Sequence, residues 1–427
     1  MRKTMPGIVA VLFAFFCAAA VVPTAAAGEA APCPAGSPCS IRIDSDDLQS
    51  IVDAAPPYAT LLADSAHEIE IAKTVRIDKP LTFVGLKARL RAGVGNTHML
   101  EVVSEGVIFT EFALTGNIES VPYKDRASLI VFRKGGFRVE NGSFHNSAKD
   151  GVMVNPTEAT GAIEHGVIRD IVGVNNARDV ISISGAGQLG LPVRHLLVEN
   201  IRCFGSRDRG AVEVSDGSED VTVRDIYSES SYYGVDVQDH RKPGQVNRNV
   251  VIDGVRVKDC PIAIRTANSD FGHDGLMIRN VSGEQWRQDK WRPLHITNTA
   301  NVFIDNVRIR GAEGAPAVVV RNSDNVILRD VVLLDAANDG EAVLVEDANH
   351  LLLDNVMFLG SGAGPAVGIR YLVRSDGRFE DLRIRNSVAR RVRDVGIALE
   401  SAGQGRLEGY SLVDNEATVR DDIGGLR

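Results

Sequence analysis

Val221-Thr-Val-Arg-Asp-Ile226 is an alternating apolar run that ends in Asp, and the same pattern returns in Val302-Phe-Ile-Asp-Asn-Val307 and Leu351-Leu-Leu-Asp-Asn-Val356. Ten consecutive segments end in this way, at Asn141, Asp170, Asn200, Asp225, Gly254, Asn280, Asn306, Asp330, Asn355 and Asn386. Their spacings run from 24 to 31 residues. Self-similarity at such a period predicts a solenoid, in which each unit buries its apolar face against its neighbours.

One repeat, Pro316–Gly340, contains three short runs of apolar and β-branched residues, at 317–320, 325–328 and 331–335. A period of two and β-branched side chains predict strands. The polar breaks between the runs leave no room for a helix, which argues against a leucine-rich repeat of similar period. Three strands per turn, each pairing with its counterpart about 4.8 Å away, predict an all-β parallel β-helix of about 13 turns.

The recurrent Asn, Asp and Gly have a physical role in this fold. A sharp turn between the second and third strands needs a left-handed backbone conformation, which these residues adopt most easily. Stacked Asn side chains can also hydrogen-bond to one another along the axis. We therefore interpret the ten residues as scaffold.

The segment before the repeats predicts a capping helix. Leu48, Ile51, Val52 and Ala55 lie at helical spacing, Ser45 or Asp46 can act as the N-cap, and Pro56-Pro57 ends the helix. A solenoid needs its open end covered. We therefore expect an N-terminal cap at about residues 41–66.

The first 27 residues have the features of a secretory signal: a basic start, an apolar core from Ile8 to Val22, and small residues before position 28. Residues 28–427 show no internal break and are predicted to form a single domain, secreted or periplasmic, without a membrane span and monomeric. Cleavage would leave 45 basic and 56 acidic residues, a net charge of −11. Such a charge argues against a nucleic-acid partner.

Four cysteines remain after the signal segment. Cys33 and Cys39 enclose a short loop, and a disulfide between them is expected in an oxidising compartment. Cys203 and Cys260 lie two turns apart, about 9–10 Å in level, which exceeds disulfide reach. We expect both to be free thiols.

The opening Leu48-Gln-Ser-Ile-Val-Asp-Ala-Ala-Pro-Pro57, followed by Val75-Arg-Ile-Asp-Lys-Pro-Leu-Thr-Phe-Val-Gly85, resembles the start of many secreted pectate-lyase-like β-helix proteins. With the repeats, the resemblance covers nearly the whole chain after the signal segment. It implies a right-handed β-helix. The superfamily includes lyases, hydrolases, uronate epimerases and proteins with no known activity, so the fold does not choose among them. In these proteins the sheet made by the first strand of each turn commonly carries the active cleft.

Alternate residues of that first strand are expected to face solvent and to stack in columns. One column places Glu213 beside Asp236, with Cβ atoms about 5 Å apart. Such a pair can share a proton, bind Ca²⁺ together with Asp216, or be neutralised by Arg265 from the next column. The alternative is a solvated surface pair with no function.

Long insertions cluster at the same turns, at 185–194, 240–249, 266–275 and 283–293, and predict the walls of a groove. The last insertion contains both tryptophans, and cationic side chains stand nearby. Aromatic rings beside cations suit an acidic sugar. The predicted substrate-binding residues are His295, Trp286, Trp291, Arg292 and Lys242. Alternatively, a tryptophan packs down over the solenoid wall.

Two family motifs are partly present. Polygalacturonases carry Asn-Thr-Asp-Gly, Asp-Asp, Gly-His-Gly and Arg-Ile-Lys on successive turns, whereas this chain has Lys149-Asp-Gly151, Arg178-Asp-Val180 and Arg209-Gly-Ala211, without the His. We interpret Asp150 and Asp179 as turn residues. Tyr233-Gly-Val-Asp-Val-Gln-Asp239 is similar to the alginate C5-epimerase sequence Tyr-Gly-x-Asp-Pro-His-Asp, with Gln in place of the His.

These observations predict an enzyme on an acidic polysaccharide, of the lyase or epimerase type. Removing the proton at C5 of a uronate needs a cation to neutralise the carboxylate, a base and an acid. Arg265 is the predicted neutraliser, and Asp236, Glu213, Asp239 and His240 are the predicted bases and acids. The alternatives are a hydrolase using a carboxylate pair in the same cleft, and a non-catalytic glycan-binding or surface solenoid protein.

Overall fold

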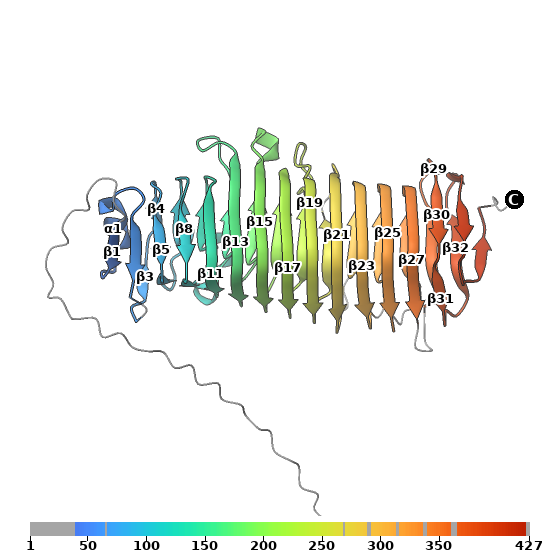
Figure 1. The fold of residues 1–427 in the computed structure, drawn as a ribbon, viewed down its shortest axis with the longest axis horizontal. Coiled ribbons are helices and arrows are strands. Elements are labelled where there is room, and N and C mark those ends of the chain that lie inside the picture. The colour runs from blue at the N-terminus through green and yellow to red at the C-terminus, as the bar shows by residue number, and fades with distance from the viewer. Residues whose placement is uncertain are drawn as a thin grey trace, which may run out of the picture. The chain divides into compact units, whose positions relative to one another are not determined.

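Two parallel sheets, whose neighbouring strands lie one turn apart in the sequence, make up the fold (Figure 1). The computed structural model describes residues 39–423, except 65, 268–269, 288–291, 313–315, 336–339 and 360–364. The predicted signal segment and Cys33 lie outside the described residues, and Cys39 is disulfide-bonded. The described part of the chain contains no helix that is long and apolar enough to cross a membrane.

Sheet B, as we name the smaller of the two sheets, contains the first strand of each turn. Fourteen strands stack in it among the described residues, in agreement with the predicted 13 or so turns. They are β4 (Val75–Ile77), β7 (Leu100–Val102), β10 (Ile130–Phe132), β12 (Val152–Val154), β14 (Ile181–Ser184), β16 (Gly210–Ser215), β18 (Tyr233–Gln238), β20 (Ile262–Ala267), β22 (Leu294–Thr297), β24 (Val318–Arg321), β26 (Glu341–Glu346), β28 (Val367–Val373), β32 (Val395–Ser401) and β35 (Val419–Asp421).

Sheet A, the larger sheet, contains nineteen strands in the described part of the chain. Nine of them are long: β11 (Phe137–His145), β13 (Ile163–Val174), β15 (Val193–Phe204), β17 (Ser218–Glu229), β19 (Arg248–Lys258), β21 (His273–Glu284), β23 (Thr299–Arg310), β25 (Asp324–Leu334) and β27 (Asn349–Leu359). Shorter strands continue the sheet at both ends: β1 (Ser40–Ile43), β2 (Thr60–Ala63), β3 (Ile69–Ile71), β5 (Thr82–Val84), β6 (Lys87–Leu90), β8 (Ile108–Thr110), β9 (Ala113–Thr115), β30 (Leu382–Arg385), β31 (Val388–Arg390) and β34 (Ser411–Val413). A separate pair joins β29 (Arg378–Glu380) to β33 (Arg406–Glu408).

The prediction of three separate strands per turn was wrong in one respect. The second and third predicted runs of the repeat at 316–340 form the single strand β25, and the other long strands are built in the same way. Each contains a left-handed residue that the ladder skips: Glu199 pairs with Arg224 and Ile201 with Ile226, so Asp225 has no partner in the register. All of the long strands except β11 contain a second such residue nearer their start, as Asp220 in β17. Pairing on both sides of the bend keeps the strand continuous.

All ten predicted turn residues have a left-handed backbone, with φ between 52° and 81°. Part of the predicted side-chain ladder is also present. The amide of Asn306 donates to Asn280 Oδ1 at 2.7 Å, and the amides of Asn200 and Asn355 donate to the Asp one turn before, Asp170 and Asp330. The recurrent Asn, Asp and Gly therefore set the bend of sheet A, as predicted.

The cap helix α1 spans Leu48–Ala54, within the predicted segment. Its N-cap is Asp47, not Ser45 or Asp46, because the Asp47 side chain accepts a hydrogen bond from the Ser50 backbone N–H at 3.1 Å. Leu48 and Val52 are buried. Three short 3₁₀ helices follow, at Ile118–Ser120, Tyr123–Asp125 and Gly187–Leu189.

The core lies between the inner faces of the two sheets and consists of stacked columns. Near the N-terminus the column is aromatic, with Phe83 stacked on Phe109 at 4.8 Å and Phe132 on Phe137 at 4.0 Å between ring centroids. Later turns are filled by Val, Ile and Leu. Cys203 and Cys260 are buried in this core and free, as predicted.

One outward column of sheet A alternates in charge over ten strands. Its members, in register, are Glu140, Arg169, Glu199, Arg224, Asp253, Arg279, Asp305, Arg329, Asp354 and Arg385. Each Arg contacts the acid one turn before it, as in the 2.7 Å pair of Arg279 with Asp253 and the 2.9 Å pair of Arg329 with Asp305. We call this column the charge ladder.

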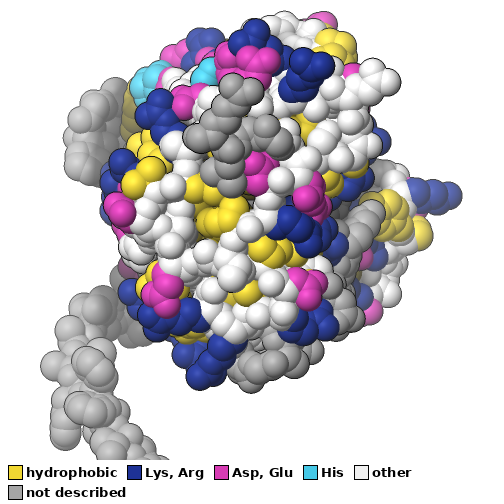
Figure 2. Space-filling model, turned by 90° about the vertical axis from the view of Figure 1, so that its right-hand side faces the viewer, with side chains coloured by type: hydrophobic (Ala, Val, Ile, Leu, Met, Phe, Trp, Pro, Cys, Tyr) yellow, Lys and Arg dark blue, Asp and Glu magenta, His cyan; other side chains and the backbone are white. Residues whose placement is uncertain are grey.

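Viewed from the end of the solenoid, hydrophobic side chains lie in the middle of the face and both signs of charge around it (Figure 2).

We expect Asn306→Ala to lower the free energy of unfolding by on the order of 1–2 kcal/mol, because Ala disfavours the left-handed backbone and loses the hydrogen bond to Asn280. Asn306→Gly is the matched control, since Gly accepts the backbone angle and loses only the amide contact. Urea unfolding of both variants measures the difference. Equal losses in the two variants would mean that backbone conformation is not what Asn306 provides.

A buried histidine predicts acid sensitivity. Burial lowers the pKa of His273 to about 4, so below pH 6.5 the unfolded chain takes up a proton that the folded chain does not. Stability should fall between pH 6.5 and 4, by about 3 kcal/mol from this residue. Thermal unfolding across that range should show a smaller fall in His273→Gln. An identical pH profile in the two proteins would contradict a neutral His273.

Candidate functional site

Sheet B carries a cluster of acids and arginines on its outer side, in strands β14 to β20 and the residues that precede them. Parallel pairing stacks equivalent residues of successive turns: Ser182 on Glu213, Glu213 on Asp236, and Asp236 on Arg265. The predicted juxtaposition of Glu213 and Asp236 is therefore present. At or just before the starts of β12, β14, β16 and β18, one equivalent position is occupied by Asp150, Asp179, Gly210 and Tyr233. Arg178 and Arg209 occupy the position before it.

Two expectations about this face need correction. Glu213 and Asp236 were expected to face solvent, but they are 1% and 0% exposed. Long side chains of neighbouring turns cover them, since Arg178 and Arg265 each lie within hydrogen-bonding distance of one carboxylate. Arg265 was expected in the next column, but strand β20 is shifted by two residues, so Arg265 takes the place predicted for Ala263. A shift of two leaves the inward face unchanged.

Asp236 is neutralised by arginine, the third of the alternatives considered for it. Arg265 Nη2 donates to Asp236 Oδ2 at 2.7 Å, and Arg209 Nη1 lies 3.7 Å from the same oxygen. The Arg265 guanidinium also lies over the rings of Tyr232 and Tyr233, 5.4 and 5.3 Å from their centroids. These contacts fix Arg265 in place by charge and by cation–π attraction.

Two side chains donate hydrogen bonds to Glu213, and a histidine lies near it. Arg178 Nη2 lies 3.1 Å from Glu213 Oε2, Ser215 Oγ donates to Oε1 at 3.1 Å, and His240 Nε2 is 3.9 Å from Oε1. Burial alone would raise the pKa of Glu213, but the attraction of Arg178 and Arg209 outweighs it and lowers the pKa to about 2. Glu213 is thus held as a buried carboxylate.

The pKa of Asp179 is shifted in the opposite direction. Burial raises the pKa of the Asp179 carboxyl well above its usual value, and the negative Glu213 beside it raises the pKa further. Tyr233 reaches across Gly210, which has no side chain, and its hydroxyl donates to Asp179 Oδ1 at 2.6 Å. Arg178 contacts both carboxyls, with its Nη2 at 3.7 Å from Asp179 Oδ2 and 3.1 Å from Glu213 Oε2. Sequence reasoning treated Asp179 as a turn residue and missed this couple.

The cluster contains Asp179 and three further carboxyl groups, of Asp150, Glu213 and Asp236. These three lie against the guanidiniums of Arg178, Arg209 and Arg265. Asp150 is fully buried and lies 3.5 Å from Arg178 Nε. We call these seven residues, with Tyr233, the arginine–acid cluster. The repeated basic residue before Asp or Gly on three successive turns was the available sequence signal for it.

The other predicted catalytic residues lie at the ends of strands β16 and β18. Asp239 is buried, and its two oxygens accept hydrogen bonds from the backbone N–H groups of Arg241 and Phe271 at 2.8 and 2.9 Å. Asp239 therefore joins two loops. His240 Nδ1 lies 2.6 Å from Asp216 Oδ1, and this hydrogen bond raises the pKa of His240. His240 borders the cluster through Glu213.

The predicted calcium ligands are engaged with cations. Asp236 contacts Arg265, Glu213 contacts Arg178, and Asp216 contacts His240. Within the described ranges no group of three or more His, Cys, Asp or Glu side chains is arranged to hold a metal ion. The geometry of Glu213, Asp236 and Asp216 therefore does not fit a calcium site, and Ca²⁺ stays an untested prediction.

The predicted substrate-binding residues are dispersed. His295 is buried beside Arg265 in the register, and burial, then Arg321 and Arg292, lower its pKa to about 3. Lys242 is exposed on the loop after β18. Trp286 packs over Gly283 of sheet A and donates to the Arg310 carbonyl at 3.0 Å, so it lies on the solenoid wall. Trp291 is outside the described residues.

The loops after β14 and β18 close over one end of the cluster. A side chain at Gly187 would come within 2.1 Å of the Gly244 carbonyl oxygen, so the two loops are in contact there. Ser184 Oγ, at the end of β14, donates to Asp216 Oδ2 at 2.8 Å. The predicted insertions at 185–194 and 240–249 thus meet beside Asp216 and His240.

No family model matches the chain, and no curated protein matches it. Solved structures do. The pre-mature gene product 12 of bacteriophage phi29 aligns with a TM-score of 0.59 and 14% identity over 87% of this chain and 54% of that one. The chain thus spans about half the length of the phage protein. This similarity supports the β-helix fold and carries no activity with it.

Two further neighbours have lower scores. The catalytic unit of a GH87 α-1,3-glucanase from Streptomyces thermodiastaticus aligns with a TM-score of 0.44 and 14% identity, over 93% of this chain and 72% of that one. PfbA, a surface adhesin of Streptococcus pneumoniae, aligns with a TM-score of 0.45 and 11% identity, over 88% and 91% of the two chains. Neither similarity bears on what this chain does.

We expect Asp179→Asn to leave the free energy of unfolding at pH 7 unchanged or higher, because Asn mimics the neutral acid and no longer has to bind a proton on folding. The advantage over wild type should shrink as the pH falls to about 4, where the wild-type group is protonated when unfolded too. Glu213→Gln is the contrasting variant, and it should lose stability because Arg178 loses its closest carboxylate. Denaturant unfolding at pH 7 and 4 measures both; a large loss in Asp179→Asn at pH 7 would mean that Asp179 is ionised.

Proposed function

We propose that this protein is a carbohydrate-active enzyme that acts on an acidic polysaccharide at the arginine–acid cluster, by proton transfer of the lyase or epimerase type. The observation that carries the proposal is the Asp179–Glu213 couple, in which neighbouring carboxyls have pKa values displaced in opposite directions beneath three guanidiniums. Two neighbouring groups whose pKa values are displaced in opposite directions are suited to act as acid and base.

The cluster contains each group that the chemistry needs. Arg178 and Arg209, about a quarter exposed at their side chains, are the cations that a uronate carboxylate would meet first. Glu213 is the candidate base, and Asp179, hydrogen-bonded to Tyr233, is the candidate acid. In a lyase step the C5 proton passes to the base, its electron pair forms the C4=C5 bond, and the leaving O4 takes a proton from the acid. In an epimerase step a proton returns to C5 from the other face.

Because Asp179 and Glu213 are buried, the substrate would have to bind before the proton is transferred. The pKa of Glu213 is low because Arg178 and Arg209 lie close to it. A substrate carboxylate that draws Arg178 outward weakens this attraction, and the pKa of Glu213 rises toward that of a useful base. Binding of an acidic ligand would thus activate the base, whereas a neutral sugar would leave Glu213 paired.

The second candidate function is binding without catalysis. The burial of the acids against arginines favours it, since none of the carboxyl groups of the cluster is exposed. The same guanidiniums would then bind acidic glycan as an adhesive surface.

We also propose export of the chain, to the periplasm or the medium. The signal-like residues 1–27 and the disulfide bond at Cys39 support it. Mass spectrometry of protein from culture supernatant and periplasm would locate the chain and its N-terminus. A full-length protein confined to the cytosol would contradict export.

The test of activity is incubation of the protein with alginate, polygalacturonate and glycosaminoglycans, with Ca²⁺ and with a chelator. Ultraviolet absorbance of unsaturated uronate indicates a lyase, and changed uronate NMR signals indicate an epimerase. Glu213→Gln and Asp179→Asn should each lower turnover by about 10²–10⁴-fold. Arg329→Gln, which removes an exposed ion pair of the charge ladder, is the control and should be unaffected. Binding without turnover would favour the second candidate function, and new reducing ends without unsaturation would indicate a hydrolase.

A further inference from the structure

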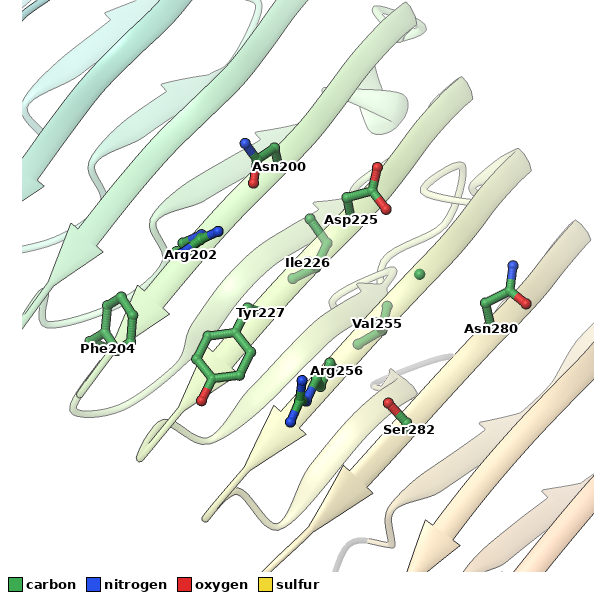
Figure 3. Close-up of a pocket in the computed structure, with 11 residues that line it drawn as sticks. Asn200, Arg202, Phe204, Asp225, Ile226, Tyr227, Val255, Arg256, Asn280 and Ser282 are labelled. Atoms are coloured by element: carbon green, nitrogen blue, oxygen red, sulfur yellow. The ribbon is translucent and has the colours of Figure 1, made fainter. Parts of the chain in front are cut away.

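A groove lies on the outer face of sheet A, on strands other than those of the arginine–acid cluster. Its main hollow has a volume of about 520 Å³ and is lined by strands β15, β17, β19 and β21 (Figure 3). A second hollow of about 290 Å³ adjoins it, extends to β23, and shares Arg256 and Ser282 with the first. The two hollows therefore form one groove that crosses five strands, about 19 Å along the solenoid axis.

The floor of the groove is a single column of residues in register. Arg202 pairs with Tyr227, Tyr227 with Arg256, Arg256 with Ser282, and Ser282 with Arg308. An arginine thus recurs at every second strand, at levels about 9.6 Å apart. No acid belongs to this run of five.

The charge ladder on the same sheet shows what is unusual about this column. In the ladder every Arg has an acid on the strand before it and contacts that acid. In the groove, Arg202, Arg256 and Arg308 make no ion pair or side-chain hydrogen bond within the described part of the chain. A row of exposed guanidiniums without carboxylate partners is available to anions from solution.

One wall of the groove lies where the ladder of turn-residue side chains is interrupted at Gly254. Gly254 has no side chain, so Asn280 donates to Asp253 and not to the turn residue of the strand before it. The Asp225 carboxylate accepts no hydrogen bond from the described residues, and it lies beside Asn200 and Asn280 along the upper edge in Figure 3. An open carboxylate accepts hydrogen bonds from hydroxyl groups and repels closely spaced anions.

Aromatic rings form the opposite side. The rings of Phe204 and Tyr227 lie 5.8 Å apart between centroids, both half-buried, with Arg202 and Arg256 beside them in Figure 3. Trp286 packs over Gly283, which lines the second hollow. Aromatic faces with hydrogen-bonding groups around them suit the apolar faces of sugar rings.

We propose that this groove binds an extended acidic polysaccharide that runs along the solenoid axis and carries an anionic group on alternate sugars. Successive sugars of an extended chain advance by about one strand spacing, so every second sugar comes level with Arg202, Arg256 or Arg308. The intervening sugars lie over Tyr227 and Ser282. The Ser282 hydroxyl can donate to them, whereas the Tyr227 hydroxyl already donates to Glu229 Oε2 at 2.7 Å and can only accept. A nucleic acid fits less well, because it has a phosphate on every residue and the groove contains the Asp225 carboxylate.

The groove is a second site, and the proposal does not depend on catalysis at the arginine–acid cluster. The two sites belong to different sheets and share no residue. In an enzyme, the groove would hold the polymer near the protein between turnovers. In a binding protein, it would add a second attachment point, which raises avidity for a long chain.

The test measures binding of hyaluronan oligosaccharides, which carry one carboxylate per two sugars, by isothermal titration to the full chain. The triple variant Arg202→Gln, Arg256→Gln, Arg308→Gln should weaken binding at least tenfold. The control variant Arg224→Gln, Arg279→Gln, Arg329→Gln changes the net charge equally on the same sheet and should stay within twofold of wild type. Arg178→Gln, in the arginine–acid cluster, should keep the oligosaccharide affinity of the groove.

Three further measurements complete the test. Carboxyl-reduced hyaluronan, which is neutral, should bind at least tenfold more weakly than the acidic form, and Phe204→Ala should weaken binding of the acidic form. Equal losses in the two triple variants would show non-specific charge attraction and overturn the proposal. Absence of binding by wild type, loss of all binding in Arg178→Gln alone, or tighter binding of single-stranded DNA would also overturn it. Circular dichroism of each variant confirms that a loss of binding is not a loss of fold.

Discussion

Parallel stacking in register is the constraint on which the rest of this structure depends. Each residue position recurs about 4.8 Å away on the next turn, so a side chain must be compatible with its equivalents above and below. Apolar columns satisfy this condition in the core, and amides satisfy it along the bend, where Asn306 donates to Asn280. The charge ladder satisfies it by alternating sign from Glu140 to Arg385. Columns that depart from these solutions are therefore the places to look for function.

Two columns depart, in opposite ways. In sheet B, Glu213 and Asp236 stack directly and are buried in contact with Arg178 and Arg265. Burial and the nearby Glu213 raise the pKa of the neighbouring Asp179. In sheet A, Arg202, Arg256 and Arg308 recur without any acid in between. In sheet B the charged side chains are buried beneath the surface, and in sheet A the guanidiniums are exposed to solvent. Neither arrangement is expected to add much to the free energy of unfolding. The attraction within a buried ion pair is largely offset by the desolvation of its charges, and an exposed arginine without a partner forms no ion pair.

The fold could be predicted from the sequence because the left-handed residues are local signals. Asn, Asp or Gly at ten bends, and the apolar alternation around them, do not depend on contacts between distant residues. The register of strand β20 could not be predicted in the same way. Ile262 and Ile264 keep their inward face under a shift of two residues, so the apolar pattern is equally consistent with Ala263 or Arg265 beside Asp236.

The burial of the candidate site also could not be predicted from the sequence pattern. Alternation correctly separates inward from outward residues, but it does not say whether an outward residue is covered by its neighbours. Glu213 is covered because Arg178 lies across it, and Asp179 is reached by Tyr233 only because Gly210 between them has no side chain. The pairing of an acid with a tyrosine two turns away depends on three residues that are distant in the sequence. Such a contact becomes visible only in three dimensions.

We propose that Asp179 is a neutral acid beside an ionised Glu213 at neutral pH. Infrared spectroscopy in D₂O tests this directly, because a protonated carboxyl absorbs apart from carboxylates and from the backbone. We expect a protonated-carboxyl band in the wild-type protein at pH 7 that is absent from the spectrum of Asp179→Asn. A wild-type spectrum at pH 7 that contains carboxylate bands alone would contradict it.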